Sequence, residues 1–164
     1  ILLGDVYKQK YPDLVVVSPD VGGVVRARAL AKRLDDADLA IIDKRRSAPN
    51  QAKAMAVIGD VNDKVAVILD DMVDTAGTLT EAVHALKEEG AREIHACCAH
   101  AVLSGPAIKR ITESEMKSMV VTDTIPLTEE AAACGKIVVI SIAELVGEAI
   151  IRSYRGDSVT SLFV

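Results

Sequence analysis

The stretch VAVILDDMVDTAGT, residues 65–78, places an apolar run directly before a cluster of acids and a small-residue turn. Residues 65–69 are apolar throughout, which is typical of a strand buried on both faces of a sheet. Three carboxylates then fall within five positions, and small residues lead towards a helix: Asp70, Asp71, Asp74, Thr75, Ala76, Gly77 and Thr78. The pattern predicts a strand, a polar loop and a helix, with carboxylates where the strand leaves the sheet.

The flanking sequence continues this alternation of strands and helices. Thr78 and Glu81 have the T-x-x-E spacing of a capping box, and Gly90 is a helix stop signal. Further strands are predicted at 14–18, 39–43, 55–59, 93–99, 119–121 and 137–140, and helices over 27–34, 79–86, 106–112 and 141–153. This order predicts an α/β class, with a doubly wound, mainly parallel sheet and helices on both faces.

Length and composition favour one domain over residues 1–164. The chain is 50% hydrophobic and 2% aromatic, so its core is built from aliphatic residues. The net charge of −5 argues against nucleic acid and anionic membranes as partners, and no apolar run is long enough to span a bilayer. Three Cys, two of them adjacent, suit a reducing cytoplasmic setting. Because Ile1 replaces an initiator Met, we expect a fragment or a processed chain.

The acidic cluster and the turn after it suit the two ends of a sugar phosphate. Parallel α/β sheets bind ligands beyond the carboxyl ends of their strands, where Asp70 and Asp71 are expected. Adjacent carboxylates can accept hydrogen bonds from a vicinal diol or help to hold hydrated Mg²⁺. The turn that ends at Thr78 precedes a helix N-terminus, which favours an anion such as phosphate. The plainer alternatives are an acidic turn and an ordinary capped helix.

Two further loops are expected at the same edge. SPDVGGVVR, residues 18–26, offers Asp20 and the paired Gly22 and Gly23, which allow close backbone approach to a ligand. KRRSAPNQAK, residues 44–53, is a polar, basic loop whose Lys44, Arg45 and Arg46 supply cations for a polyphosphate. The alternatives are a simple glycine turn and a solvated basic surface. The three histidines receive no site role.

These segments resemble one known family. VAVILDDMVDTAGT is similar to the phosphoribosyl diphosphate signature of type I phosphoribosyltransferases, in the version found in ribose-phosphate diphosphokinases. SPDVGG, IIDKRR, HAVLSGPAIKRI, VVTDTIPL and SVTSLF also resemble segments of that family, in its order and over nearly the whole chain. The resemblance implies a type I phosphoribosyltransferase fold and Mg²⁺-dependent synthesis of 5-phosphoribosyl 1-diphosphate and AMP from ribose 5-phosphate and ATP.

The resemblance also implies roles for individual residues. Ribose 5-phosphate would lie on Asp70, Asp71 and the turn formed by residues 74–78. Asp20 would be a Mg²⁺ ligand beside a diphosphate loop that includes Gly22 and Gly23. Lys44 and Arg46 would be the catalytic residues that close on the transferred diphosphate. The family implies a cytoplasmic homo-oligomer, a hexamer when full length.

Some features depart from the family pattern. Its members have two homologous domains, and this chain resembles only the C-terminal one, so ATP binding would need the other half. Residues 34–38 are one residue longer than usual, and Ser161 replaces an aromatic residue.

Three rival functions stay open. A non-catalytic regulatory homologue that binds phosphoribosyl compounds is opposed by the intact acids and by Lys44 and Arg46. A phosphoribosyltransferase of nucleotide synthesis would need a hood over a nucleobase, which no segment suggests. A phosphoaspartyl enzyme would need D-x-D after the strand, and residues 70–74 lack that spacing.

Overall fold

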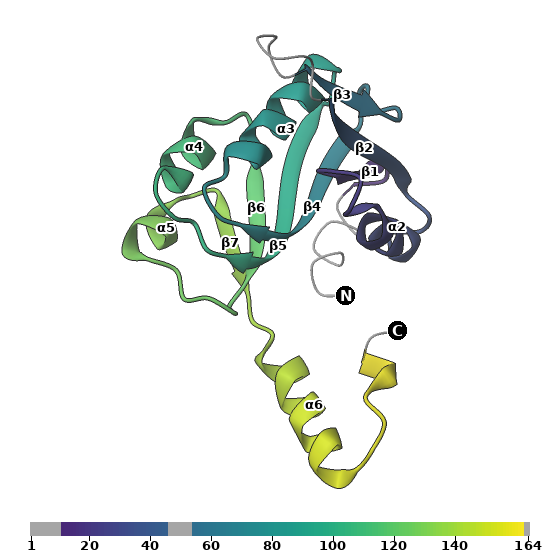
Figure 1. Ribbon diagram of the computed structural model, residues 1–164, viewed down its shortest axis with the longest axis vertical. Coiled ribbons are helices and arrows are strands. Elements are labelled where there is room, and N and C mark those ends of the chain that lie inside the picture. The colour runs from purple at the N-terminus through teal and green to yellow at the C-terminus, as the bar shows by residue number, and fades with distance from the viewer. Residues whose placement is uncertain (1–10, 46–53, 163–164) are drawn as a thin grey trace.

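The computed structural model describes residues 11–45 and 54–162, and these form an α/β fold around one sheet (Figure 1). The sheet has seven strands in the order β3-β2-β1-β4-β5-β6-β7. All neighbours are parallel except β2 and β3. The strands are β1 (Leu14–Ser18), β2 (Asp38–Arg45), β3 (Ala54–Ile58), β4 (Val65–Val73), β5 (Glu93–Ala101), β6 (Ser118–Thr122) and β7 (Ile137–Ile140). The doubly wound, mainly parallel sheet predicted from the sequence is confirmed.

Helices cover both faces because the central strands are apolar on both sides. On one face α2 (Val24–Arg33) packs through Ala27, Leu30 and Ala31 against β1 and β4. On the other face lie α3 (Gly77–Glu88), α4 (Ala107–Glu113) and α5 (Glu129–Ala133). Val15, Val16 and Val17 of β1 are fully buried, as a strand between two helical layers requires.

Three predicted boundaries are wrong by a few residues. The strand predicted at 65–69 continues to Val73, because β4 pairs with β5 beyond the end of β1. Residues 44 and 45, predicted to begin a loop, are the last residues of β2 and pair with β3. The capping box at Thr78 is absent, since α3 begins at Gly77 and its N-cap is Ala76.

The C-terminal helix α6 (Ala143–Arg155) projects away from the sheet, and the short helix η1 (Thr160–Leu162) folds back towards it (Figure 1). No residue of α6 is buried. The helix itself was predicted from the sequence, but its separation from the core was not. Among the described residues, no helix is long and apolar enough to cross a membrane.

Candidate functional site

Asp70 and Asp71 lie on the part of β4 that extends past β1. Ile68 is the last β4 residue paired with β1, whereas Asp70 pairs with Cys98 of β5. The side of β4 that faces β1 is therefore unpaired at the two acids. Asp70 is half-buried and Asp71 is exposed, so both carboxylates are accessible at the carboxyl edge of the sheet. They lie in a strand rather than in the turn that the sequence suggested.

The ionisation of Asp70 at this edge is influenced first by burial and then by the neighbouring carboxylates. Partial burial raises the pKa of Asp70 above its ordinary value, and the charges of Asp71 and Asp20 raise it further, while the Asp71 backbone N–H, 2.9 Å from Oδ1, works in the opposite direction. The loop after β1 lies beside the end of β4, because Val17 of β1 pairs with Ile68 just before the two acids. A cation or a set of hydroxyl donors would relieve this repulsion.

The loop of residues 18–23 is held closed by its own side chains. Ser18 Oγ donates to the Asp20 carbonyl at 2.6 Å, and Asp20 Oδ1 accepts from the Gly23 N–H at 2.8 Å. A Cβ at Gly23 would lie 2.7 Å from Ser18 Oγ, and one at Gly22 would lie 3.3 Å from Asp20 Oδ1. Glycine is required at position 23 because the loop folds tightly onto its own side chains. The predicted diphosphate loop is therefore compact, with the exposed Asp20 at its rim.

Arg26 connects this loop to the acids of β4. Its Nη2 lies 3.2 Å from Asp71 Oδ2, and both side chains are about half exposed. Arg26 was given no role from the sequence, because a basic residue on the polar side of a helix is usually solvated. Its position in the first turn of α2, directly after the glycine loop, was the only available signal. The ion pair links the end of β4 to the start of α2.

The turn of residues 74–78 brings an unusual backbone conformation to the start of α3. Ala76 has φ +57° and ψ +10°, a left-handed conformation that is rare for residues other than glycine. Its methyl group is 4% exposed and packs into the core. Asp74, Thr75 and Thr78 are exposed. Because no side chain caps α3, the first N–H groups of the helix remain available to an anion.

A second segment, residues 103–110, supports this turn from the side. The N–H groups of Leu103 and Ser104 donate to the carbonyls of Val73 and Asp74 at 3.1 Å, and Ser104 Oγ also contacts Asp74 Oδ1. Arg110 Nη1 donates to the Thr75 carbonyl at 2.9 Å. These supporting contacts were not predicted from the sequence, because they join segments about 30 residues apart in the chain.

Of the predicted catalytic pair, Lys44 and Arg46, only Lys44 lies among the residues that the structure describes. Lys44 lies in β2, three positions after Ile41, which pairs with Ser18 at the end of β1. Its backbone is therefore at the same edge of the sheet as Asp20. Arg46 lies outside the described residues. The prediction that both act on the diphosphate remains untested.

The described residues contain no cluster of three or more His, Cys, Asp or Glu side chains arranged to hold a metal ion. The predicted Mg²⁺ ligand, Asp20, has one carboxylate oxygen occupied by the Gly23 N–H and is exposed. Oxygen donors at the carboxyl edge nevertheless suit Mg²⁺, which usually takes only one or two protein carboxylates and retains its waters. Burial raises the pKa of Asp70, and the charges of Asp71 and Asp20 raise it further, so a cation at this edge would offset their repulsion.

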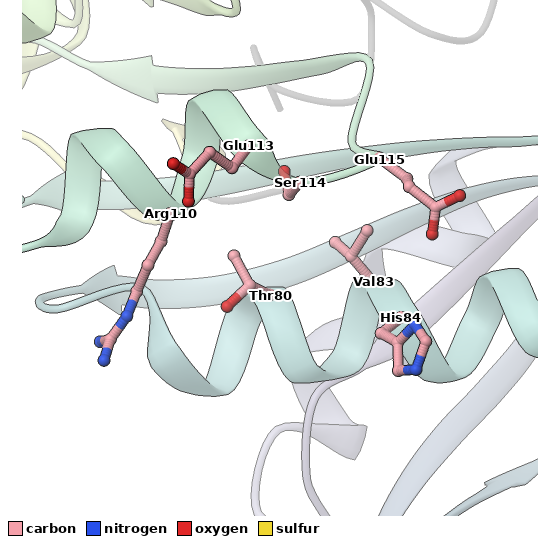
Figure 2. Close-up of a pocket in the computed structure, with 7 residues that line it drawn as sticks. All are labelled: Thr80, Val83, His84, Arg110, Glu113, Ser114 and Glu115. Atoms are coloured by element: carbon pink, nitrogen blue, oxygen red, sulfur yellow. The ribbon is translucent and has the colours of Figure 1, made fainter.

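A cavity of about 310 Å³ lies beside the turn, between α3 and α4 (Figure 2). Thr80, Val83 and His84 line it from α3, and Arg110 and Glu113 line it from α4. In Figure 2 the Arg110 side chain extends from α4 towards the start of α3. None of the predicted site residues lines this cavity, so it is distinct from the edge formed by Asp20, Asp70 and the turn.

Comparisons with known proteins agree with this geometry. The phosphoribosyl synthetase-associated domain family matches residues 42–164. A ribose-phosphate pyrophosphokinase of Bordetella pertussis is 58% identical over 163 residues, 99% of this chain and 52% of that protein. A crystal structure of phosphoribosylpyrophosphate synthetase from Mycobacterium smegmatis has a TM-score of 0.84 and 37% identity, and covers 94% of this chain and 49% of that one.

A more distant structure shares the fold alone. A purine phosphoribosyltransferase from Pyrococcus horikoshii has a TM-score of 0.51 and 21% identity over 85% of this chain and 82% of that one. This chain spans about half the length of the curated relatives it matches. The chain therefore has the type I phosphoribosyltransferase fold and belongs to the phosphoribosyl synthetase-associated domain family.

Proposed function

We propose that this chain binds ribose 5-phosphate and serves, in the complete protein, as part of a ribose-phosphate diphosphokinase. The observation that carries the proposal is the meeting of Asp20, Asp70 and Asp71 with the open turn of residues 74–78 at one edge of the sheet. The β4 carboxylates accept hydrogen bonds from the ribose hydroxyls. The N–H groups of Thr75, Ala76, Gly77 and Thr78 surround the 5-phosphate, which the positive end of α3 favours.

The proposed reaction transfers a diphosphoryl group. The C1 hydroxyl oxygen of ribose 5-phosphate forms a bond to the β-phosphorus of ATP, and the bond from that phosphorus to the α–β bridging oxygen breaks. AMP leaves with the electron pair of the broken bond, and the hydroxyl proton passes to solvent. Such a transfer needs positioned positive charge rather than a covalent nucleophile, which is the role proposed for Lys44 and Arg46.

Mg²⁺ is proposed as the cofactor, with Asp20 as a ligand and the loop of residues 18–23 against the diphosphate. When bound, the ion neutralises charge on the phosphate oxygens. Gly22 is exposed and carries no side chain, so it leaves its backbone open to a phosphate, whereas Gly23 closes the loop through its bond to Asp20. We further propose that ATP contacts require the half of the relatives that this chain does not match, and that the complete protein is a cytoplasmic homo-oligomer.

Calorimetric titration of ribose 5-phosphate into the 164-residue chain with Mg²⁺ tests the binding half of the proposal. Ribose and inorganic phosphate, each titrated separately, serve as controls. We expect ribose 5-phosphate to bind more tightly than either control, and Asp74→Asn to weaken it. Equal affinity for ribose 5-phosphate and inorganic phosphate would contradict a site that recognises both ends of the ligand.

A chimera tests the catalytic half. The segment of the Bordetella pertussis relative that this chain does not match is joined to the chain, and AMP release from ATP is followed with and without ribose 5-phosphate. We expect AMP release that depends on ribose 5-phosphate and Mg²⁺. A folded chimera that binds ribose 5-phosphate but releases no AMP would favour the regulatory homologue instead.

A further inference from the structure

Two successive peptides at the start of α3 are fixed by hydrogen bonds to different partners. The Ala76 carbonyl accepts from the Thr80 N–H at 3.0 Å and from Thr80 Oγ1 at 2.9 Å, so it points into the helix. The Thr75 carbonyl instead accepts from Arg110 Nη1 at 2.9 Å and points towards α4. The guanidinium also packs onto the turn, because a Cβ at Gly77 would lie 3.2 Å from Arg110 Nη1.

The direction of the Thr75 carbonyl determines the direction of the next N–H group. In a planar trans peptide the C=O and the N–H point in opposite directions. Because Arg110 holds the Thr75 carbonyl on the side of α4, the Ala76 N–H is directed to the opposite side of that peptide. An anion at the turn can then accept a hydrogen bond from Ala76 in addition to those from the helix N-terminus.

This peptide orientation has a conformational cost that Arg110 offsets. Ala76 is left-handed at φ +57°, a conformation that strains a residue with a Cβ. A flip of the Thr75–Ala76 peptide would take φ of Ala76 into the ordinary negative range and relieve this strain. The flip would also remove the Thr75 carbonyl from Arg110 and turn the Ala76 N–H away from the ligand.

We propose that Arg110 is a positioning residue for the anion-binding turn, which acts by holding the Thr75–Ala76 peptide in the orientation that directs the Ala76 N–H at the phosphate of a sugar phosphate. The inference rests on the proposed function, because it assigns that turn to the 5-phosphate. Arg110 itself need not contact the ligand. Ser104 supports the same turn from the other end through its contacts with Asp74.

The first experiment compares ribose 5-phosphate binding by the 164-residue chain and by two single variants, using calorimetry with Mg²⁺. We expect R110A to bind about tenfold to a hundredfold more weakly, the loss associated with one hydrogen bond to a charged group. K109A is the matched control, because Lys109 is 75% exposed, carries the same charge and pairs only loosely with Glu113 at 4.0 Å. We expect K109A to bind normally. R110K, which keeps a donor and the charge, should recover part of the affinity.

A double-mutant cycle separates peptide positioning from simple charge attraction. A76G removes the cost of positive φ, so the loss caused by R110A should be smaller by about fivefold in the A76G background. A direct attraction between Arg110 and the phosphate would give the same loss in both backgrounds and would overturn the inference. Amide NMR gives an independent readout: the Ala76 N–H resonance should shift on addition of ribose 5-phosphate in K109A but not in R110A.

The outcomes distinguish this inference from the proposed function. Absence of binding by the unaltered chain would overturn both. Binding by the unaltered chain that R110A leaves unchanged would overturn the role of Arg110 alone. Thermal unfolding is recorded for every variant, and R110Q replaces R110A in the cycle if R110A does not fold, since it also lacks the guanidinium that contacts Thr75.

Discussion

Asp70 shows how a single residue at the site works against the stability of the fold. Burial, followed by the charges of Asp71 and Asp20, raises its pKa above the ordinary value of 3.8. A carboxyl group with a raised pKa destabilises the folded state wherever it is ionised. The loss of folding free energy is absent below the ordinary pKa of 3.8. It grows as the pH rises from there to the pKa of the folded state, and it is constant at higher pH. A carboxylate kept in such an unfavourable environment is expected to serve binding.

We therefore predict that Asp70→Asn stabilises the chain and weakens ligand binding. The free energy of unfolding, measured by urea denaturation, should exceed that of the unaltered chain at pH 7, and the difference should vanish near pH 3.5. Affinity for ribose 5-phosphate should fall about tenfold or more, because a charged acceptor for sugar hydroxyls is lost. Asp36→Asn, at an exposed position in the loop after α2, is the control. A stability difference independent of pH would contradict the repulsion argument.

Lys44 supports a prediction about turnover. If its ammonium group stabilises charge on the transferred diphosphate, Lys44→Ala in the Bordetella chimera should lower kcat by about 10²- to 10³-fold, the usual effect of removing one preorganised donor. The KM for ribose 5-phosphate should change much less, because the sugar phosphate is bound by β4 and the turn. Lys32→Ala, on the exposed side of α2, is the control. Unchanged kcat in Lys44→Ala would remove this lysine from the catalytic proposal.

The residues identified from the sequence are those whose roles can be inferred from their immediate neighbours in the chain. Asp70 and Asp71 follow an apolar run, and Gly22 and Gly23 follow an acid, so each pattern is visible within a few positions. Arg26, Ser104 and Arg110 were missed because their roles come from contacts between elements. Spacing along the chain contains no information on how far a side chain reaches across to another segment.

At the scale of elements, the central strands were predictable because their residues are apolar on both faces. The start of α3 was not, because the T-x-x-E spacing at Thr78 competes with a turn whose left-handed Ala76 is held by tertiary contacts. The extension of β4 to Val73 was also missed, since acids rarely continue a buried strand. Pairing with β5 alone is sufficient to continue β4 through these residues, and it leaves the acids accessible.

A group of polar side chains ties together the starts of β5 and β6, at the edge opposite the site. Glu93 Oε2 lies 2.8 Å from Lys117 Nζ and accepts from Tyr11 Oη at 3.1 Å. The bond from Lys117 lowers the pKa of Glu93 to about 2, with Tyr11 contributing in the same direction and desolvation opposing it. The side chain of Glu93 is 27% exposed, so these contacts are only partly screened.

We predict that Glu93→Gln destabilises the chain by about 1 to 2 kcal/mol at pH 7, because charge-assisted hydrogen bonds are lost. A lowered pKa means that the contribution of Glu93 is complete above its ordinary value of 4.5 and is lost as the pH falls towards 2. The unaltered chain should therefore lose its advantage over Glu93→Gln between pH 4.5 and 2 in urea denaturation. Glu89→Gln, at an exposed position after α3, is the control. An advantage that persists at pH 2 would argue against this role.

At the scale of the whole molecule, the sheet and its two helical layers bury a continuous core, but α6 stands apart from it (Figure 1). Val146, Ile150 and Tyr154 recur every four residues along α6 and are 45%, 63% and 92% exposed. On β7, the edge strand next to it, Val138 and Val139 are also exposed. The periodicity predicted a helix correctly, yet it could not show that the apolar side would lie outside the core.

An exposed apolar stripe of this kind favours association between molecules. We predict that the 164-residue chain self-associates in a concentration-dependent manner and that Ile150→Glu weakens this association about tenfold or more, because burial of an isoleucine side chain contributes about 1.5 to 3 kcal/mol. Sedimentation velocity over a range of concentrations measures the effect. Val25→Glu is the matched control, because Val25 is 80% exposed but lies on α2, away from the stripe. A chain that remains monomeric at all concentrations, or equal effects of the two substitutions, would show that the α6 stripe does not drive association.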